Sequence, residues 1–258
     1  LGEAARTAHD AERYFESYQR AIAAIGKAAA GRGPIQSPGI SVKLSALHPR
    51  YEMAQRHRVM NELVPRLIEL GKAAKASDIG FTIDAEEAER LDISLDVIEG
   101  VSASPALAGW NGLGLAIQGY QKRCLPLIDW LADLARRHRR RLMVRLVKGA
   151  YWDSEIKMSQ ERGLSGYPVF TRKATTDVSY LACARRLLAD PAAFYPQFAT
   201  HNAHSLSAII EMAGEEAASR DKLEFQRLHG MGEALYDQVT PPEAMGIPCR
   251  VYAPVGSH

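Results

Sequence analysis

Residues 113–147, LGLAIQGYQKRCLPLIDWLADLARRHRRRLMVRLV, hold the pattern that decides the fold. Two short apolar runs, Leu113–Gln118 and Leu142–Val147, stand at its ends, and each predicts a buried β-strand. The stretch between them carries apolar residues at helical spacing, namely Leu127, Ile128, Leu131 and Leu134. A strand, a helix and another strand in this order predict two parallel strands joined by a crossover helix.

The same alternation continues along the rest of the chain. Further strands are predicted at Ile40–Ser45, Phe81–Ile83, Phe198–Thr200, Phe225–Leu228 and Cys249–Ala253. Two helical segments show a clear apolar face, the first formed by Phe15, Tyr18, Ile22 and Ile25 and the second by Val59, Leu63, Leu67 and Leu70. Pro65 lies inside the second segment, where we expect it to kink or restart the helix.

Repeated strand–helix alternation predicts a parallel sheet, either an open doubly wound sheet or a closed (β/α)8 barrel. The length of 258 residues suits a barrel, which typically has about 250. No low-complexity linker or shift in composition interrupts the sequence. We therefore predict one α/β domain over residues 1–258, a (β/α)8 TIM barrel.

Composition excludes several classes of protein. A formal net charge of +2 is too small to indicate a polyanionic partner, and the three cysteines form no C-x-x-C pair. The basic run Arg136–Arg141 ends a helical stretch, where cations complement the helix dipole, and it has no interleaved aromatic residues. We expect no nucleic-acid partner through this segment, no metal site, and a reducing, cytoplasmic location. The first residue is not Met, so we expect an internal fragment of a longer chain.

Polar or ionisable residues stand at the carboxyl ends of most predicted strands. They are Lys43, Asp84, Gln118, Arg145, Lys148, His201, Asn202, Gln226, His229 and Tyr252. In parallel α/β folds ligands bind at this edge, and a polar group in a buried strand is costly unless it has a partner. The set predicts a polar active site there.

The residues alone leave the chemistry of that site open. The run His201-Asn-Ala-His204 is too short a signal for zinc, and Gly230-Met-Gly232 lacks the third glycine of a dinucleotide fingerprint. Lys43 and Lys148 could serve as Schiff-base nucleophiles, as in a class I aldolase, or pair with an acid or phosphate. Spacing therefore predicts a barrel enzyme for a small, anionic ligand or cofactor and does not identify the cofactor.

Six longer runs are more specific than any of these motifs. They are 40–51 ISVKLSALHPRY, 145–153 RLVKGAYWD, 171–180 TRKATTDVSY, 198–204 FATHNAH, 224–232 EFQRLHGMG and 251–258 VYAPVGSH. In order and across almost the whole chain, they resemble the proline dehydrogenase domain of the bacterial bifunctional proline utilisation A (PutA) flavoenzymes. Residues Leu1–Ala5 resemble the end of that family's first barrel strand.

The resemblance implies a distorted barrel that holds FAD non-covalently at the strand carboxyl ends. It implies oxidation of L-proline to Δ1-pyrroline-5-carboxylate, the first step of proline catabolism to glutamate. Electrons would pass to a membrane quinone, with the protein peripheral at the inner face of the cytoplasmic membrane. A pyrroline-5-carboxylate dehydrogenase domain is expected on the same parent chain.

The resemblance also implies roles for single residues near the substrate. Lys43 matches the lysine that pairs with the proline carboxylate, and Asp84 matches an acid beside the active site. Tyr151 and Tyr252 match aromatic positions around substrate and flavin, and Tyr252 is expected to pack on proline as well. Glu3 matches a substrate-site glutamate that forms a gate with an arginine.

On the cofactor side, Gln118 and Arg145 match groups that hydrogen-bond the isoalloxazine, with Arg145 near N5 and counted as catalytic. The other positions expected to contact FAD are Val147, Lys148, Gly149, Ala150, Trp152, Thr171, Arg172, Lys173, Thr200, His201, Asn202, Gln226 and Leu228.

The sequence departs from the family pattern at both ends. No residues here match most of the family's first strand or its final helix. In the family, that helix carries two arginines and a glutamate that bind proline. We therefore expect a segment that retains the FAD contacts but has an incomplete proline site. Besides the aldolase-like enzyme, the remaining alternative is a non-catalytic relic that binds a nucleotide and acts as a scaffold.

Overall fold

The computed structural model describes residues 4–254. Its strands are β1 (Ile40–Val42), β2 (Phe81–Ile83), β3 (Leu113–Gln118), β4 (Leu142–Val147), β5 (Phe194–Ala199), β6 (Glu224–Leu228) and β7 (Cys249–Tyr252). Its α-helices are α1 (Ala8–Ala29), α2 (Leu44–Leu47), α3 (Arg56–Ala76), α4 (Leu91–Ser102), α5 (Cys124–Arg137), α6 (Trp152–Glu161), α7 (Lys173–Leu188), α8 (Ala203–Ala213) and α9 (Glu233–Tyr236). Short 3-10 helices are η1 (Met53–Gln55), η2 (Ala88–Arg90), η3 (Pro105–Leu107) and η4 (Gly214–Ala218).

The strands form one seven-stranded sheet in the order β1-β2-β3-β4-β5-β6-β7. The pairs β1–β2, β2–β3, β5–β6 and β6–β7 are parallel. A doubly wound sheet reverses its strand order at a switch point, whereas a barrel keeps its strands in chain order. The strand order therefore confirms the predicted α/β fold of the (β/α)8 type.

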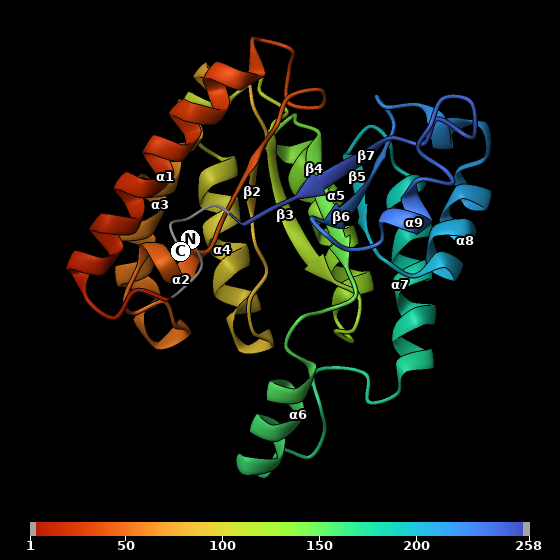
Figure 1. Cartoon of the computed structure of the whole chain (residues 1–258). Helices are drawn as coiled ribbons and strands as arrows, with labels where there is room; N and C mark the ends of the chain where they lie inside the picture. Colours follow the sequence, from red (N-terminus) through yellow and green to blue (C-terminus); the bar gives the residue numbers. More distant parts are fainter. Residues whose placement is uncertain (1–3, 255–258) are drawn as a thin grey trace. The chain divides into compact units, whose positions relative to one another are not determined.

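The chain divides into two compact units. The first holds the chain up to Leu115 together with Leu134–Met143, and the second holds Ala116–Asp133 and Val144–Ala253. In the first unit α1 lies beside α3 (Figure 1). The buried apolar residues of these two helices include Phe15, Tyr18, Ile22, Val59, Leu63, Leu67 and Leu70, as the sequence predicts. Among residues 4–254 no helix combines the length and the apolarity that crossing a bilayer requires.

Several predicted element boundaries differ from the structure. The first strand ends at Val42 and not at Ser45, because Leu44–Leu47 turns into the short buried helix α2. The helix α3 does not restart at Pro65. Pro65 and Asn61, the residue whose carbonyl loses its helical partner, are both exposed, so water can satisfy that carbonyl. The strand β5 begins at Phe194, four residues before the predicted start.

Strand β3 requires a glycine where it passes its neighbour. A Cβ added at Gly114 would lie 2.3 Å from the Met143 carbonyl oxygen, inside the first unit. We expect Gly114→Ala to lower the free energy of unfolding by about 3 kcal/mol, because backbone atoms of a buried strand must move. Urea denaturation of the complete protein measures this. Gly166→Ala, with nothing within 4 Å of its new Cβ, is the matched control; equal midpoints for the two variants would contradict the prediction.

Candidate active site

In the first unit, Lys43 and Asp84 end neighbouring strands at the same edge. Val42 is paired with Ile83, so the two polar residues follow paired positions. The Asp84 N–H donates to the Val42 carbonyl at 2.9 Å, and the Lys43 N–H donates to the Tyr18 hydroxyl oxygen at 3.2 Å. Lys43 precedes α2 without using its side chain as a cap. Its ammonium group is therefore not needed to hold the helix start.

In the second unit, Arg145 of β4 is held by side chains of the last two strands. Its Nε donates to Gln226 Oε1 at 2.7 Å, and its guanidinium carbon lies 4.8 Å from the centroid of the Tyr252 ring. Gln226 Nε2 in turn donates to Glu224 Oε1 at 2.7 Å. The result is a fixed cation whose orientation is set by a buried amide and an aromatic ring.

The loop after β4 is joined to the end of β3. Gln118 Oε1 accepts the Ala150 N–H at 3.2 Å, and the Gly119 N–H donates to the Val147 carbonyl at 2.8 Å. Gly149 has φ 148°, and a Cβ at this position would lie 2.4 Å from the Tyr120 ring. Only glycine therefore allows this loop to pass Tyr120 with its backbone exposed.

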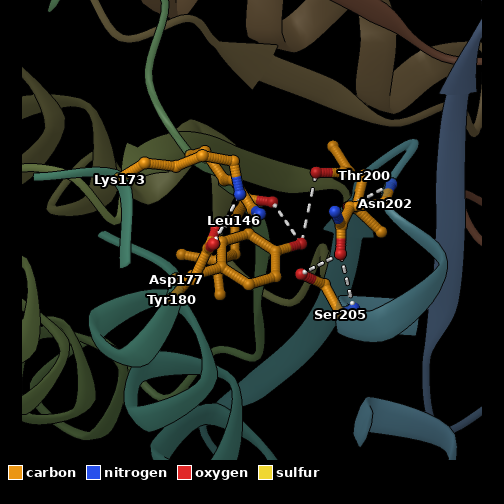
Figure 2. Close-up of polar contacts among 9 residues, drawn as sticks. Leu146, Lys173, Asp177, Tyr180, Thr200, Asn202 and Ser205 are labelled. Carbon is orange, nitrogen blue, oxygen red and sulfur yellow. Dashed lines mark hydrogen bonds and ion pairs between the residues drawn. The ribbon is translucent and has the colours of Figure 1, made fainter. Parts of the chain in front are cut away.

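Two lysines, one directly after β4 and one at the start of α7, contact the same carboxylate. Figure 2 shows Lys173 and Asp177 of this cluster. Asp177 forms a very short contact with Lys148 and accepts from Lys173 at 2.6 Å. The hydrogen bonds from the two lysines lower the pKa of the Asp177 carboxyl, and the bond from Lys148 has the larger effect. Lys148 also lies 5.8 Å from the ring of buried Tyr180, whose hydroxyl donates to the Ala199 carbonyl at 3.2 Å. Lys148 thus pairs with an acid, which is one of the roles that the sequence leaves open for it.

The end of β5 is fixed by its own polar side chains. Asn202 caps α8 by accepting the Ser205 N–H at 2.9 Å, and its own N–H donates to the Thr200 hydroxyl at 3.1 Å. His201 Nε2 accepts the Leu228 N–H at 3.0 Å. Burial, and then the charge of Arg227, lower the pKa of His201, so the neutral ring that this bond needs is favoured.

The donor chemistry of the second unit suits the flavin nucleotide that the sequence resemblance implies. Lys148 and Lys173 place two ammonium groups near the start of the sixteen-residue helix α7, where N–H groups and the helix dipole favour an anion such as a diphosphate. Arg145 and the amide of Gln118 suit the acceptor atoms of an isoalloxazine ring. Within residues 4–254, no group of three or more His, Cys, Asp or Glu side chains is placed to hold a metal ion.

Most of the predicted site residues lie in the second unit; Lys43 and Asp84 lie in the first, and Glu3 falls outside the described residues. Buried members are Gln118, Thr200 and Gln226. Half-buried members are Lys43, Asp84, Arg145, Val147, Lys148, Tyr151, Asn202 and Tyr252. Exposed members are Gly149, Ala150, Trp152, Thr171, Arg172, Lys173, His201 and Leu228.

The sequence analysis missed four residues of these hydrogen-bond and ion-pair networks. Glu224 and Gln197 were missed because they lie before the carboxyl ends of their strands, and Arg250 because it precedes Tyr252 in the last strand. A charged residue that opens a buried strand is the signal that could have found Glu224. Asp177 follows Lys173 by four residues, which is the spacing of an ion pair on a helix.

Comparison with known proteins gives consistent matches over the whole chain. The family described as Proline dehydrogenase matches residues 1–258. The bifunctional protein PutA of Salmonella typhimurium is 64% identical over 100% of this chain, which covers 20% of that protein. Proline dehydrogenase 2 of Bacillus subtilis is 26% identical over 84% of this chain and 60% of its own length. The chain thus spans about a fifth of the length of the PutA relatives it matches.

Solved structures of PutA proteins also match this chain. A mutant of PutA from Bradyrhizobium japonicum matches with a TM-score of 0.95 and 61% identity, covering 99% of this chain and 26% of that one. PutA from Bdellovibrio bacteriovorus inactivated by N-propargylglycine matches with a TM-score of 0.91 and 29% identity, covering 100% and 28%.

Proposed function

Because the chain belongs to the proline dehydrogenase family, whose match covers all of its residues, we propose that residues 1–258 are the proline-oxidising part of a PutA-type flavoenzyme. The reaction is oxidation of L-proline to Δ1-pyrroline-5-carboxylate, which opens proline catabolism to glutamate. The structural observation that carries the proposal is the half-buried guanidinium of Arg145, hydrogen-bonded to Gln226 at the carboxyl end of the parallel sheet.

FAD, when bound, supplies the acceptor for the hydride that leaves C5 of proline. Arg145 and Gln118 would hold its ring, and Lys148, Lys173 and the Thr171 hydroxyl its diphosphate. The guanidinium of Arg145 would provide a fixed positive field for charge that develops on the ring.

On the substrate side, the Lys43 ammonium would pair with the proline carboxylate as a point charge. Tyr252 would pack on the apolar pyrrolidine ring and exclude water. Forming the imine requires a free lone pair on the proline nitrogen. The rate of proline oxidation should therefore rise with pH as the substrate amine loses its proton.

The partners of the complete protein follow from its relatives. PutA relatives are described as bifunctional, and this chain covers only 20% of their length. We propose a pyrroline-5-carboxylate dehydrogenase domain on the same parent chain and a membrane quinone as electron acceptor. The complete protein would be cytoplasmic and dock peripherally on the inner face of the cytoplasmic membrane.

The visible absorption spectrum of the complete protein, recorded before and after anaerobic addition of L-proline, tests the proposal. Flavin bands that bleach with proline are expected. Bands that persist would favour a non-catalytic nucleotide-binding scaffold. A protein without bands after FAD is supplied would contradict the flavoenzyme, and borohydride trapping on Lys43 or Lys148 would then support an aldolase.

The lysine cluster gives a prediction for cofactor affinity. Asp177 places one negative charge between the two lysines proposed to face the diphosphate. We expect Asp177→Asn to tighten FAD binding by about fivefold, because one charge repulsion of about 1 kcal/mol is removed. Fluorescence titration of the apoprotein at several salt concentrations measures this, and Asp177→Glu is the charge-preserving control. Weaker binding by Asp177→Asn would contradict repulsion and show that the carboxylate holds the lysines in place.

A further inference from the structure

The carboxylate of Glu224 lies in the interior of the second unit with its side chain 0% exposed. Its Oε1 accepts hydrogen bonds from Gln226 Nε2 at 2.7 Å, Gln197 Nε2 at 2.8 Å and Arg250 Nε at 2.8 Å. Its Oε2 accepts from Arg250 Nη2 at 2.9 Å. Arg250 therefore neutralises this buried charge with a two-point contact, and the two glutamines are additional donors.

The two glutamines differ in what lies on their other side. Gln226 presents its Oε1 to Arg145 Nε at 2.7 Å, so its amide joins the carboxylate to the guanidinium. Gln197 Oε1 is buried and has no hydrogen-bond partner among residues 4–254. Both amides thus contact the same oxygen of Glu224, and only Gln226 continues to Arg145.

The carboxylate fixes which way the Gln226 amide points. An amide offers an oxygen that only accepts and a nitrogen that only donates. With Nε2 toward Glu224, Oε1 must face Arg145. The reversed amide would set oxygen against a carboxylate and N–H against a guanidinium N–H, two repulsive contacts in a buried site.

We infer that Glu224 is a positioning residue for Arg145, acting through the orientation of the Gln226 amide. This inference rests on the proposed function, in which Arg145 faces the flavin ring. Displacing the Arg145 guanidinium weakens its stabilisation of charge on the reduced ring. The midpoint potential of the bound flavin, as well as the rate of its reduction, would therefore depend on a fully buried carboxylate.

Different results are expected if Glu224 only stabilises the fold. A buried ion pair can contribute little net stability, but removing one partner leaves the other charge unpaired. If the Glu224–Arg250 pair only supported the fold, loss of either glutamine would have similar, small consequences for the flavin. If Glu224 positions Arg145, only the glutamine that reaches Arg145 should matter.

The matched variants Gln226→Met and Gln197→Met separate these roles in the complete, FAD-containing protein. Each removes one amide donor from Glu224 Oε1 and leaves the Arg250 pair intact, so both should fold. We expect Gln226→Met to make two-electron reduction of the flavin about tenfold less favourable, a fall in midpoint potential of about 30 mV. We expect Gln197→Met to leave the potential unchanged.

The variant Glu224→Gln completes a double-mutant cycle with Gln226→Met. If Glu224 acts through Gln226, the double variant should change the potential no more than the larger single variant. An unchanged potential in Glu224→Gln, additive shifts in the double variant, or equal shifts for Gln197→Met and Gln226→Met would each overturn the inference. These outcomes differ from failure of the proposed function, in which the unmodified protein would hold no flavin that L-proline reduces.

Discussion

Arg145→Met should slow the reduction of bound flavin by L-proline about a hundredfold, the cost of removing one preorganised donor from a developing negative charge. The methionine keeps a flexible chain of similar length but supplies neither the charge nor the hydrogen bond to Gln226. It also removes the cation that lies over the Tyr252 ring. Stopped-flow absorbance under anaerobic conditions measures the rate, and a redox titration measures the midpoint potential, which should fall.

Arg145→Lys distinguishes loss of charge from loss of geometry. Lysine restores the positive charge as a point charge but not the planar donor fork that Gln226 holds. We therefore expect Arg145→Lys to have a flavin midpoint potential close to that of the unmodified protein. Its rate of flavin reduction should lie between the rates of the unmodified protein and Arg145→Met. An Arg145→Met protein with unchanged rate and potential would show that this guanidinium does not act on the flavin.

The sequence predicts much of the fold because apolar runs and helical faces are local patterns. The bounds of β3 and β4 agree with prediction, since each is a mostly apolar run with a glycine or a charged residue on either side. The β1 boundary failed because Leu44–Leu47 is as apolar as a strand and forms a buried helix instead. Pro196 lies inside β5, and a proline in a strand is a signal against extending it, which hid the true start.

The site could be predicted only in part, for a physical reason. Polar side chains near the carboxyl ends of strands are visible in the sequence because they stand in or beside apolar runs, which is how Lys43, Asp84 and Arg145 were found. Glu224 opens its strand, and its importance depends on contacts with residues far away in sequence, such as Gln226's partner Arg145. Long-range pairing of this kind leaves no spacing pattern. The cofactor likewise came from resemblance and not from spacing, because isolated lysines and glutamines suit many anions.

Lys43→Met tests the substrate half of the site, and it should raise the KM for L-proline about thirtyfold while leaving flavin content unchanged. Truncating one partner of a hydrogen-bonded charge pair costs about 2 kcal/mol or more, which corresponds to that factor. The fold should survive, because the Lys43 contact with Tyr18 uses the backbone N–H and the side chain does not cap α2.

Steady-state kinetics of the complete protein separate binding from chemistry in this variant. A carboxylate contact made equally in the ground state and the transition state changes KM and leaves kcat nearly constant. Lys43→Arg, which keeps the charge, should recover part of the affinity. Lys72→Met removes an exposed lysine of α3 and is the control for a general loss of charge in the first unit. A Lys43→Met enzyme with unaltered KM would show that another cation binds the proline carboxylate, whereas a fall in kcat alone would place Lys43 at the reacting atoms.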